Sequence, residues 1–136
     1  MTPPREPGAP EDVVRGFLLD VRSGARPDRV HRYLAPRVQA HQGPPGAVHA
    51  VVERSPGQYA AHVQEMQRAV GPWTFEVLGV TAAAAGRVEA AWRQSGAAGT
   101  GGSPGRRVVE HGRATYLVED GRITQYWIDA RQEVLP

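Results

Sequence analysis

The chain contains no cysteine and no lysine. Without cysteine there is no disulfide, no thiolate nucleophile and no cysteine-ligated metal. The five histidines show none of the HxH, HxxxH or HExxH spacings of metal sites, which predicts that no metal is bound. No apolar run approaches the roughly 20 residues of a membrane-spanning helix, so we expect no membrane partner. The glycine-rich stretch GTGGSPG opens no helix after a strand, as a nucleotide-binding loop would.

Positive charge is carried by arginine alone, with 16 basic and 14 acidic residues and a net charge of +2. The arginines are scattered along the chain instead of forming a basic stripe, which argues against a nucleic-acid partner. The N-terminal segment MTPPREPGAPED has no basic segment followed by an apolar core, unlike a secretory signal. We therefore expect a cytoplasmic protein.

The chain reads as a disordered tail at residues 1–10 followed by a single domain at residues 11–136. The tail holds four prolines and little apolar surface. Apolar residues then recur at three- and four-residue spacing up to Ser23-Gly24, which predicts an amphipathic helix. Its apolar stripe consists of Val13, Val14, Phe17, Leu18 and Val21.

A second, short helix is predicted from Pro27, with Tyr33 and Leu34 facing inward. Pro36 ends this helix because proline cannot continue the backbone hydrogen-bond ladder. The segment RVQAH, which ends at His41, reads as a short strand, and a loop is predicted after it.

A third helix is predicted to begin after Ser55. Ser55 as the N-cap, Pro56 at the first helical position and Gln58 three residues on match a capping box. The apolar stripe of this helix consists of Tyr59, Val63, Met66 and Val70.

After residue 72 the hydrophobic period changes from 3.6 to 2. This change predicts strands in WTFEVLGVT, RVEAAWRQS, RRVVEHGRATYLV and RITQYWIDAR. The loop at residues 96–105 reads as either a flexible lid or a plain hairpin loop. Helices followed by an antiparallel meander predict an α+β domain with helices on one face of a curved sheet.

The dipeptide Asp120-Gly121 predicts a two-residue hairpin turn, since a type I′ turn needs positive φ at both central positions. If pairing continues outward without interruption, the register of the two strands can be computed. One face then carries the pairs Val118 with Ile123, Tyr116 with Gln125, Ala114 with Trp127, Gly112 with Asp129, and Glu110 with Arg131.

This face has two interpretations. The missing side chains at Gly112 and Ala114, opposite a tryptophan and an acid, are typical of a pocket floor. Alternatively, Glu110, Asp129 and Arg131 form a solvated charge cluster at the end of the sheet, where such pairs contribute little.

The chain resembles the SnoaL-like polyketide cyclases of the NTF2-like superfamily. The resemblance rests on the order of elements, on LAPRVQAHQ and SPGQYAAHVQEMQRAVGPW, and on VEDGRI followed by YW, and it covers residues 11–135. It implies a cone in which a curved antiparallel sheet wraps around about three N-terminal helices and encloses an apolar pocket. It also implies a homodimer, a small hydrophobic polyketide-like substrate, and no metal or organic cofactor.

Cyclases of this family commonly use an acid a few residues after the Trp of the last strand and a His on the neighbouring strand. Those positions hold Arg131 and Ala114 here, whereas Asp129 lies two residues earlier on the same face. We therefore predict Asp129 as the principal acid/base group, Arg131 as its electrostatic partner and either His41 or Glu110 as a secondary group. The predicted substrate-binding residues are Tyr33, Tyr59, Trp92, Glu110, Tyr116, Gln125 and Trp127.

Three functions follow from these features. The first is a cofactor-independent cyclase or isomerase that uses acid–base catalysis in an enclosed pocket. The second is a binding or assembly module that keeps the fold without chemistry. The third is an epoxide hydrolase, because related cone-shaped folds use Asp-Arg-Asp sets to activate water.

Overall fold

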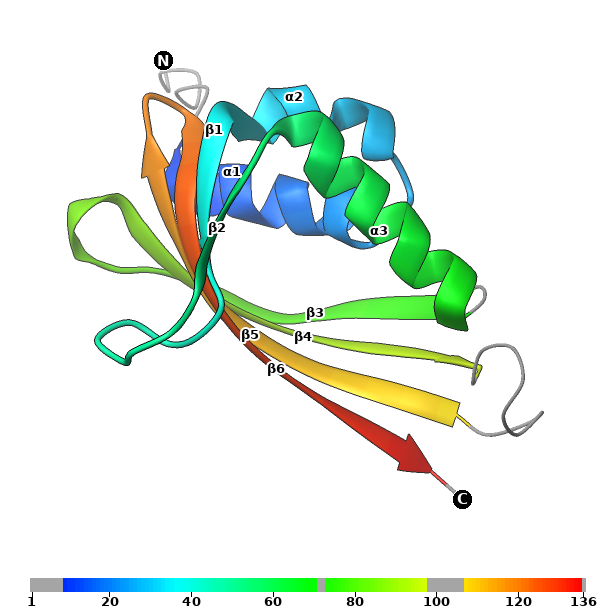
Figure 1. Cartoon of the computed structure of the whole chain (residues 1–136). Coiled ribbons are helices and arrows are strands. Elements are labelled where there is room, and N and C mark those ends of the chain that lie inside the picture. Colours follow the sequence, from blue (N-terminus) through cyan, green and yellow to red (C-terminus); the bar gives the residue numbers. More distant parts are fainter. Residues whose placement is uncertain (1–8, 71–72, 98–106, 136) are drawn as a thin grey trace, which may run out of the picture.

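The computed structural model describes residues 9–70, 73–97 and 107–135. The predicted α+β class is confirmed: helices lie on one side of a curved, six-stranded sheet (Figure 1). The helical elements are α1 (Pro10–Phe17), η1 (Leu18–Arg22), η2 (Pro27–Arg29), α2 (Val30–Tyr33), α3 (Pro56–Val70) and η3 (Ala84–Gly86). The strands are β1 (Leu34–His41), β2 (Val51–Arg54), β3 (Trp73–Ala82), β4 (Arg87–Ala97), β5 (Arg107–Glu119) and β6 (Arg122–Leu135).

Two predictions fall on segments that the structure does not describe. Residues 1–8 of the predicted tail and residues 98–105 of the predicted loop lie outside the described residues. Pro10, which we assigned to the tail, is the first residue of α1.

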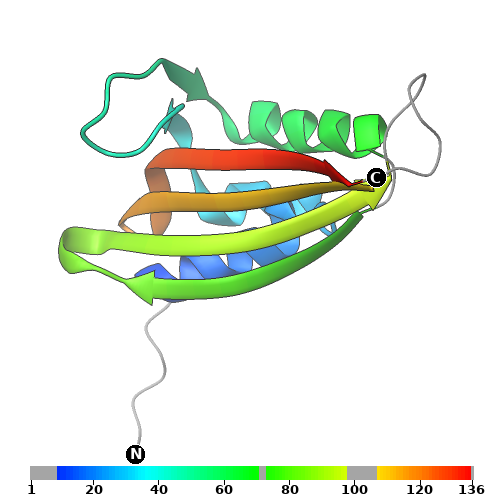
Figure 2. The same cartoon turned by 90° about the horizontal axis from the view of Figure 1, so that it is seen from below.

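The sheet has the strand order β2-β1-β6-β5-β4-β3. The predicted meander is confirmed, since β3, β4, β5 and β6 pair consecutively and antiparallel. β1 pairs parallel to β6, and β2, which we placed in a loop, adds to β1 as an antiparallel edge strand. The side of the sheet that faces the helices is termed the inner face and the other side the outer face. Figure 2 looks onto the outer face, with α1 behind the strands.

The predicted first helix is confirmed, but its second half is the π-helical turn η1. A π-helical turn holds more residues than an α-helical turn, because its hydrogen bonds reach one residue further. The wider turn rotates Arg22 from the edge of the apolar stripe, where an α-helix would place it, towards the centre. Arg22 is consequently only 2% exposed.

The second helix ends one residue earlier than predicted. Leu34, which we assigned to the helix, is the first residue of β1 and is buried. Ala35 precedes Pro36, and steric contact with the proline ring favours extended backbone at that position. The chain therefore changes from helix to strand before the proline.

The capping box of α3 is confirmed. The backbone N–H of Gln58 donates to Ser55 Oγ at 3.2 Å, and the backbone N–H of Ser55 donates to Gln58 Oε1 at 2.8 Å. Tyr59 and Val63 of the predicted stripe are 5% and 0% exposed, so α3 presents this face to the core.

The predicted register of the last hairpin is correct at its turn. Asp120 and Gly121 have φ values of 52° and 78°, as a type I′ turn requires. Val118 pairs with Ile123, as predicted.

Beyond the turn the predicted register is wrong. Thr124 is an extra residue on β6, so Tyr116 pairs with Tyr126 and not with Gln125. Such a β-bulge inserts one residue on one strand only. Because side chains alternate between faces, every later β6 side chain points to the face opposite the predicted one.

The core lies between the inner face and the helices. α1 contributes Val14 and Phe17, which are both fully buried, and packs against β3 and β4. α3 packs against α2 and β1. None of the described helices is long and apolar enough to cross a membrane.

Candidate functional site

A buried ion pair joins the first helix to the inner face of the sheet. Arg22 Nη2 donates to Glu110 Oε2 at 2.5 Å, and Nη1 donates to Gln94 Oε1 at 2.8 Å. Glu110 on β5 and Gln94 on β4 are direct cross-strand partners, and they are 8% and 7% exposed. Arg22, and not the predicted Arg131, is therefore the charge partner of Glu110.

Aromatic rings surround the guanidinium of Arg22. Its Cζ lies 5.7, 5.8 and 5.5 Å from the ring centroids of Trp73, Phe75 and Trp92, within the range of cation–π attraction. Trp92 Nε1 also donates to Glu110 Oε2 at 3.3 Å. The hydrogen bonds from Arg22 and Trp92 both end on Oε2, and no donor from the described residues reaches Oε1.

The space predicted beside Gly112 is filled. Gly112 pairs with Trp92 across β4 and β5, and a Cβ at position 112 would lie 2.0 Å from Trp92 Cε2. Ala114 is 7% exposed and pairs with Ile128 instead of Trp127. The predicted pocket floor is wrong at Gly112, because the indole of the neighbouring strand occupies it, whereas Ala114 lines a small hollow together with Trp127 and Asp129.

Three tyrosines on the inner side cluster around Phe17. The ring centroids of Tyr59 and Tyr116 lie 5.2 and 5.7 Å from that of Phe17, and Tyr126 lies within 6.1 Å of both tyrosines. Burial raises the pKa of all three phenols, and the charges of Arg22 and Glu110 act on Tyr59 and Tyr116 as well. Within the described part of the chain, the hydroxyls of Tyr59 and Tyr116 have no hydrogen-bond partner.

His62 on α3 belongs to the same electrostatic environment. Burial lowers the pKa of its imidazole, and the positive charges of Arg54 and Arg22 lower it further, whereas Glu65 and Glu110 oppose the shift. The imidazole is therefore neutral at pH 7, since its ordinary pKa is about 6.5. A neutral imidazole can accept one proton and donate another.

The bulge places four of the predicted site residues on the outer face, namely Gln125, Trp127, Asp129 and Arg131. Trp127, Asp129 and Arg131 follow Thr124 on β6, and Asp129 and Arg131 are exposed. The prediction that they share a face with Glu110 is wrong, because the extra residue reverses the alternation of the strand.

The structure brings His41, Gln125 and Trp127 together on the outer face. The imidazole of His41 stacks on Trp127 with centroids 4.6 Å apart and an interplanar angle of 13°. His41 Nε2 lies 3.0 Å from Gln125 Oε1 and Nδ1 lies 2.9 Å from His49 Nε2. Because an amide oxygen only accepts, Nε2 is the protonated nitrogen. These predicted residues are neighbours, but the sheet separates them from Glu110.

Tyr33, predicted to bind substrate, connects two helical segments. Its hydroxyl donates to Asp20 Oδ2 at 2.5 Å, and Arg29 Nη1 lies 3.4 Å from the same oxygen. Burial raises the pKa of the Tyr33 phenol, and the hydrogen bond to Asp20 raises it further. These contacts tie α2 to η1 and do not involve the Arg22–Glu110 pair.

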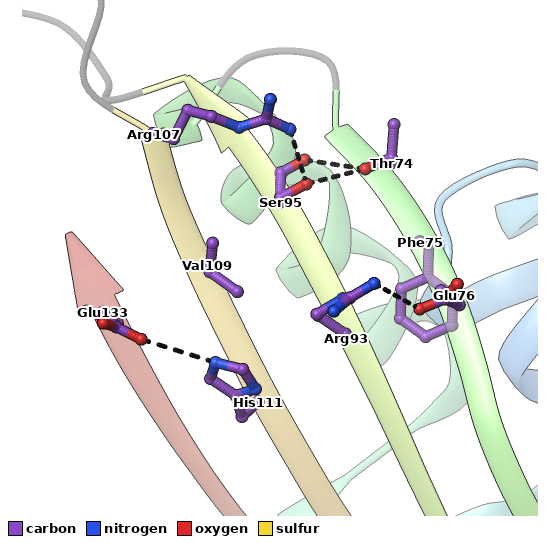
Figure 3. Close-up of a pocket in the computed structure, with 9 residues that line it drawn as sticks. All are labelled: Thr74, Phe75, Glu76, Arg93, Ser95, Arg107, Val109, His111 and Glu133. Atoms are coloured by element: carbon purple, nitrogen blue, oxygen red, sulfur yellow. Dashed lines mark hydrogen bonds and ion pairs between the residues drawn. The ribbon is translucent and has the colours of Figure 1, made fainter. Parts of the chain in front are cut away.

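A hollow of about 780 Å³ lies over strands β3 to β6 on the outer face (Figure 3). Four of its ionisable side chains are paired with one another, and Arg107 Nη2 donates to Ser95 Oγ at 3.1 Å. Arg93 Nη2 donates to Glu76 Oε1 at 2.8 Å, and His111 Nε2 lies 3.7 Å from Glu133 Oε2. Among the described residues, no group of three His, Asp or Glu side chains could hold a metal ion.

Sequence reasoning missed two polar residues of the inner side, Arg22 and Gln94. Arg22 continues the four-residue spacing of the first apolar stripe, so a charged residue on an apolar stripe was the available signal. Gln94 lies two residues after Trp92 and therefore on the same face of the strand. His62 follows Tyr59 by three residues on one helix face, but its burial could not be read from spacing alone.

Residues 14–126 match the family model of the SnoaL-like domain, which is most of the chain. The chain belongs to the SnoaL-like family. Among proteins with curated descriptions, none matches this SnoaL-like protein significantly.

Solved structures share the fold of this SnoaL-like protein. IdmH, a proposed polyketide cyclase from Streptomyces antibioticus, has a TM-score of 0.72 at 19% identity over 90% of this chain and 91% of its own. A proposed polyketide cyclase from Acidithiobacillus ferrooxidans has a TM-score of 0.69 at 18% identity, and the match covers 96% of this chain and 91% of the cyclase. An epoxide hydrolase from M. tuberculosis has a TM-score of 0.62 at 20% identity, and the match covers 90% of this chain and 82% of the hydrolase. At these identities the likeness shows the NTF2-like fold.

Proposed function

We propose that this SnoaL-like protein is a cofactor-independent enzyme that closes or isomerises a ring by acid–base catalysis on the inner side of the sheet. The observation that carries the proposal is the carboxylate of Glu110. One of its oxygens is held by Arg22 and Trp92, while the other has no donor among the described residues. A carboxylate anchored on one side is suited to act as a general base with its second oxygen.

Glu110 takes the proton in this proposal. The two hydrogen bonds on Oε2 fix the direction of the carboxylate, and Oε1 removes a proton from the carbon next to a substrate carbonyl. Arg22 is a positioning residue, because it acts through Glu110. Its place in the wide turn η1 and its contacts with three aromatic rings hold the guanidinium still.

Tyr59 and Tyr116 stabilise the enolate oxygen that forms. Burial keeps both phenols neutral, so each retains a proton that it can donate. Preorganised donors aimed at developing negative charge make a large contribution to catalysis. Glu110 then returns the same proton to the new position on the substrate, which restores its carboxylate.

The substrate that we propose is a small, ring-bearing polyketide-type metabolite. Aromatic side chains dominate the inner side around Glu110, and they favour flat apolar molecules. Structural neighbours named as proposed polyketide cyclases support this substrate class. A role in antibiotic biosynthesis is part of the same proposal. We further propose a cytoplasmic homodimer; light scattering after size exclusion would show a mass of about 29 kDa for a dimer, twice the 14.7 kDa of one chain.

The experiment measures deuterium exchange next to the carbonyl of an aromatic ketone such as 1-tetralone, by proton NMR in D₂O. Glu110→Gln is expected to slow the protein-catalysed exchange by about a hundredfold or more, because a general base contributes roughly 10²–10⁴. Glu133→Gln is the matched control, since Glu133 is exposed on the outer face. Exchange by Glu110→Gln at the wild-type rate would remove Glu110 from the mechanism.

The same assay tests Asp129, the catalytic group predicted from the sequence. Asp129→Asn should leave exchange unchanged if Glu110 is the base, because the two carboxylates lie on opposite faces of the sheet. A loss confined to Asp129→Asn would move catalysis to the outer face, with Arg131 and His41 as its partners.

A binding module without chemistry is the second candidate. It is favoured by the contacts of Arg22 with Glu110 and Gln94, which balance the charge of the buried carboxylate without a ligand. Absence of ketone exchange, combined with saturable binding of the ketone, would support it. Epoxide hydrolysis is the third candidate. If the protein releases a diol from styrene oxide and this release depends on Glu110, epoxide hydrolysis is selected over isomerisation.

A further inference from the structure

A smaller hollow of about 290 Å³ opens on the outer face, on the opposite side of the sheet from Glu110. Its lining includes Pro44, Pro45, Glu89, Arg113, Trp127 and Asp129. The strands β4, β5 and β6 supply the four strand residues, and the two prolines come from the β1–β2 connection. The volume is close to the lower end of the range for small-molecule sites.

The walls of this hollow are held in place. Trp127 stacks on His41, and Arg87 Cζ lies 5.0 Å from the Trp127 ring centroid, so both neighbours fix the indole. The connection that carries the prolines is closed by a bond from the backbone N–H of Gln42 to the carbonyl of Ala50 at 2.9 Å.

His49 completes this support. Its Nε2 contacts His41 Nδ1 at 2.9 Å, which ties the connection to the sheet. Gly43 allows the close approach, because a Cβ there would lie 2.9 Å from His49 Cβ. The hollow is thus preformed, which reduces the entropy that a ligand must lose to order it.

Three charged side chains of the hollow are not engaged with one another. Arg113 and Asp129 are direct cross-strand partners, yet neither forms an ion pair with a described residue, and the same holds for Glu89. In the larger hollow of the same face, by contrast, Arg93 is paired with Glu76. One cation and two anions therefore remain available in the smaller hollow.

We propose that this hollow binds a small zwitterion with an apolar side group, of which an α-amino acid is the simplest. Arg113 binds the carboxylate through its planar guanidinium, and Asp129 and Glu89 bind the ammonium. Neighbouring strands are about 5 Å apart, so Arg113 and Asp129 are spaced to contact charges on one carbon. The prolines and the edge of Trp127 contact the apolar group.

Titration of the labelled protein by proton–nitrogen NMR tests the proposal, with the indole resonance of Trp127 as the reporter. L-Phenylalanine is compared with 3-phenylpropanoate, which lacks the ammonium, and with 2-phenylethylamine, which lacks the carboxylate. L-Phenylalanine is expected to bind at least about tenfold more tightly than either, because each removed group leaves a charge of the hollow unpaired.

Two variants assign the charges. Arg113→Gln should reduce the affinity for L-phenylalanine to that for 2-phenylethylamine, and Asp129→Asn should reduce it towards that for 3-phenylpropanoate. Arg93→Gln, on the same face and 53% exposed, is the control and should leave binding unchanged. No saturable shift of the Trp127 indole, equal affinity for all three compounds, or an unaffected Arg113→Gln protein would each overturn the proposal.

Discussion

Trp92 and Gly112 lie opposite each other on β4 and β5, and the indole fills the space that a side chain at position 112 would need. The same indole donates to Glu110 and packs on Arg22, so one ring connects the glycine to the buried ion pair. Packing at Gly112 and the geometry of the candidate catalytic carboxylate are therefore linked.

Gly112→Ala is expected to destabilise the protein by about 1–3 kcal/mol, the usual cost of overpacking a filled core. The added Cβ would lie 2.0 Å from Trp92 Cε2, and the indole must move. Urea unfolding measures the change. Gly57→Ala is the control, since no atom lies within 4 Å of its Cβ and the residue is helical. Equal stability of Gly112→Ala and wild type would contradict the packing.

Removing one partner of the buried ion pair should be costly. Arg22→Met is expected to lower the free energy of unfolding by about 3–5 kcal/mol, because it leaves the carboxylate of Glu110 buried without its charge partner. Arg22→Met combined with Glu110→Leu should cost less than the sum of the two single changes. Additive losses in this double-mutant cycle would show that the two side chains are not coupled.

His62 should make stability fall in mild acid. Burial lowers the pKa of the folded-state imidazole below its unfolded value of about 6.5, so the unfolded chain binds the proton more readily. The contribution is fully present above pH 6.5 and is lost as the pH falls through the folded pKa. His62→Gln should therefore flatten the dependence of the urea midpoint on pH between 7 and 5. A slope unchanged by the substitution would assign the effect to another group.

Tyr59 should make stability fall in alkali. Burial raises the pKa of its phenol above the ordinary value of 10.0, so the folded state keeps the proton that the unfolded state loses. The contribution is fully present below pH 10 and is lost as the pH rises through the folded pKa. Tyr59→Phe should reduce the loss of stability between pH 9 and 11. Val88→Ala, a control in the same core, should lower stability without changing that slope.

Local patterns in the sequence predicted most of the fold. The stripe of α1, the capping box at Ser55 and the turn at Asp120 are each determined by neighbouring residues, and each is confirmed. The edge strand β2 was missed, because its three exposed residues and one half-buried residue carry no alternation of burial. Pairing of β1 with β6 could not be predicted, since it joins distant segments.

The candidate site was harder to predict because it depends on the register. The apolar residues Ile123, Tyr126 and Ile128 are spaced by three and then by two, a pattern that indicates a bulge and that strict alternation overlooks. Because the predicted register ignored the bulge, it placed Asp129 on the wrong face of the sheet. Arg22 and Glu110 are 88 residues apart, so only the folded chain shows that they are partners.

The bulge at Thr124 also decides how this strand can change during evolution. No single substitution exchanges the two sets of β6 side chains, whereas loss of one codon at position 124 would turn Trp127, Asp129 and Arg131 inward together. A chain that lacks the bulge can therefore be aligned with this one along β6 only if a gap is allowed at that position. Without the gap, a residue that lines the interior of one protein would be equated with a surface residue of the other.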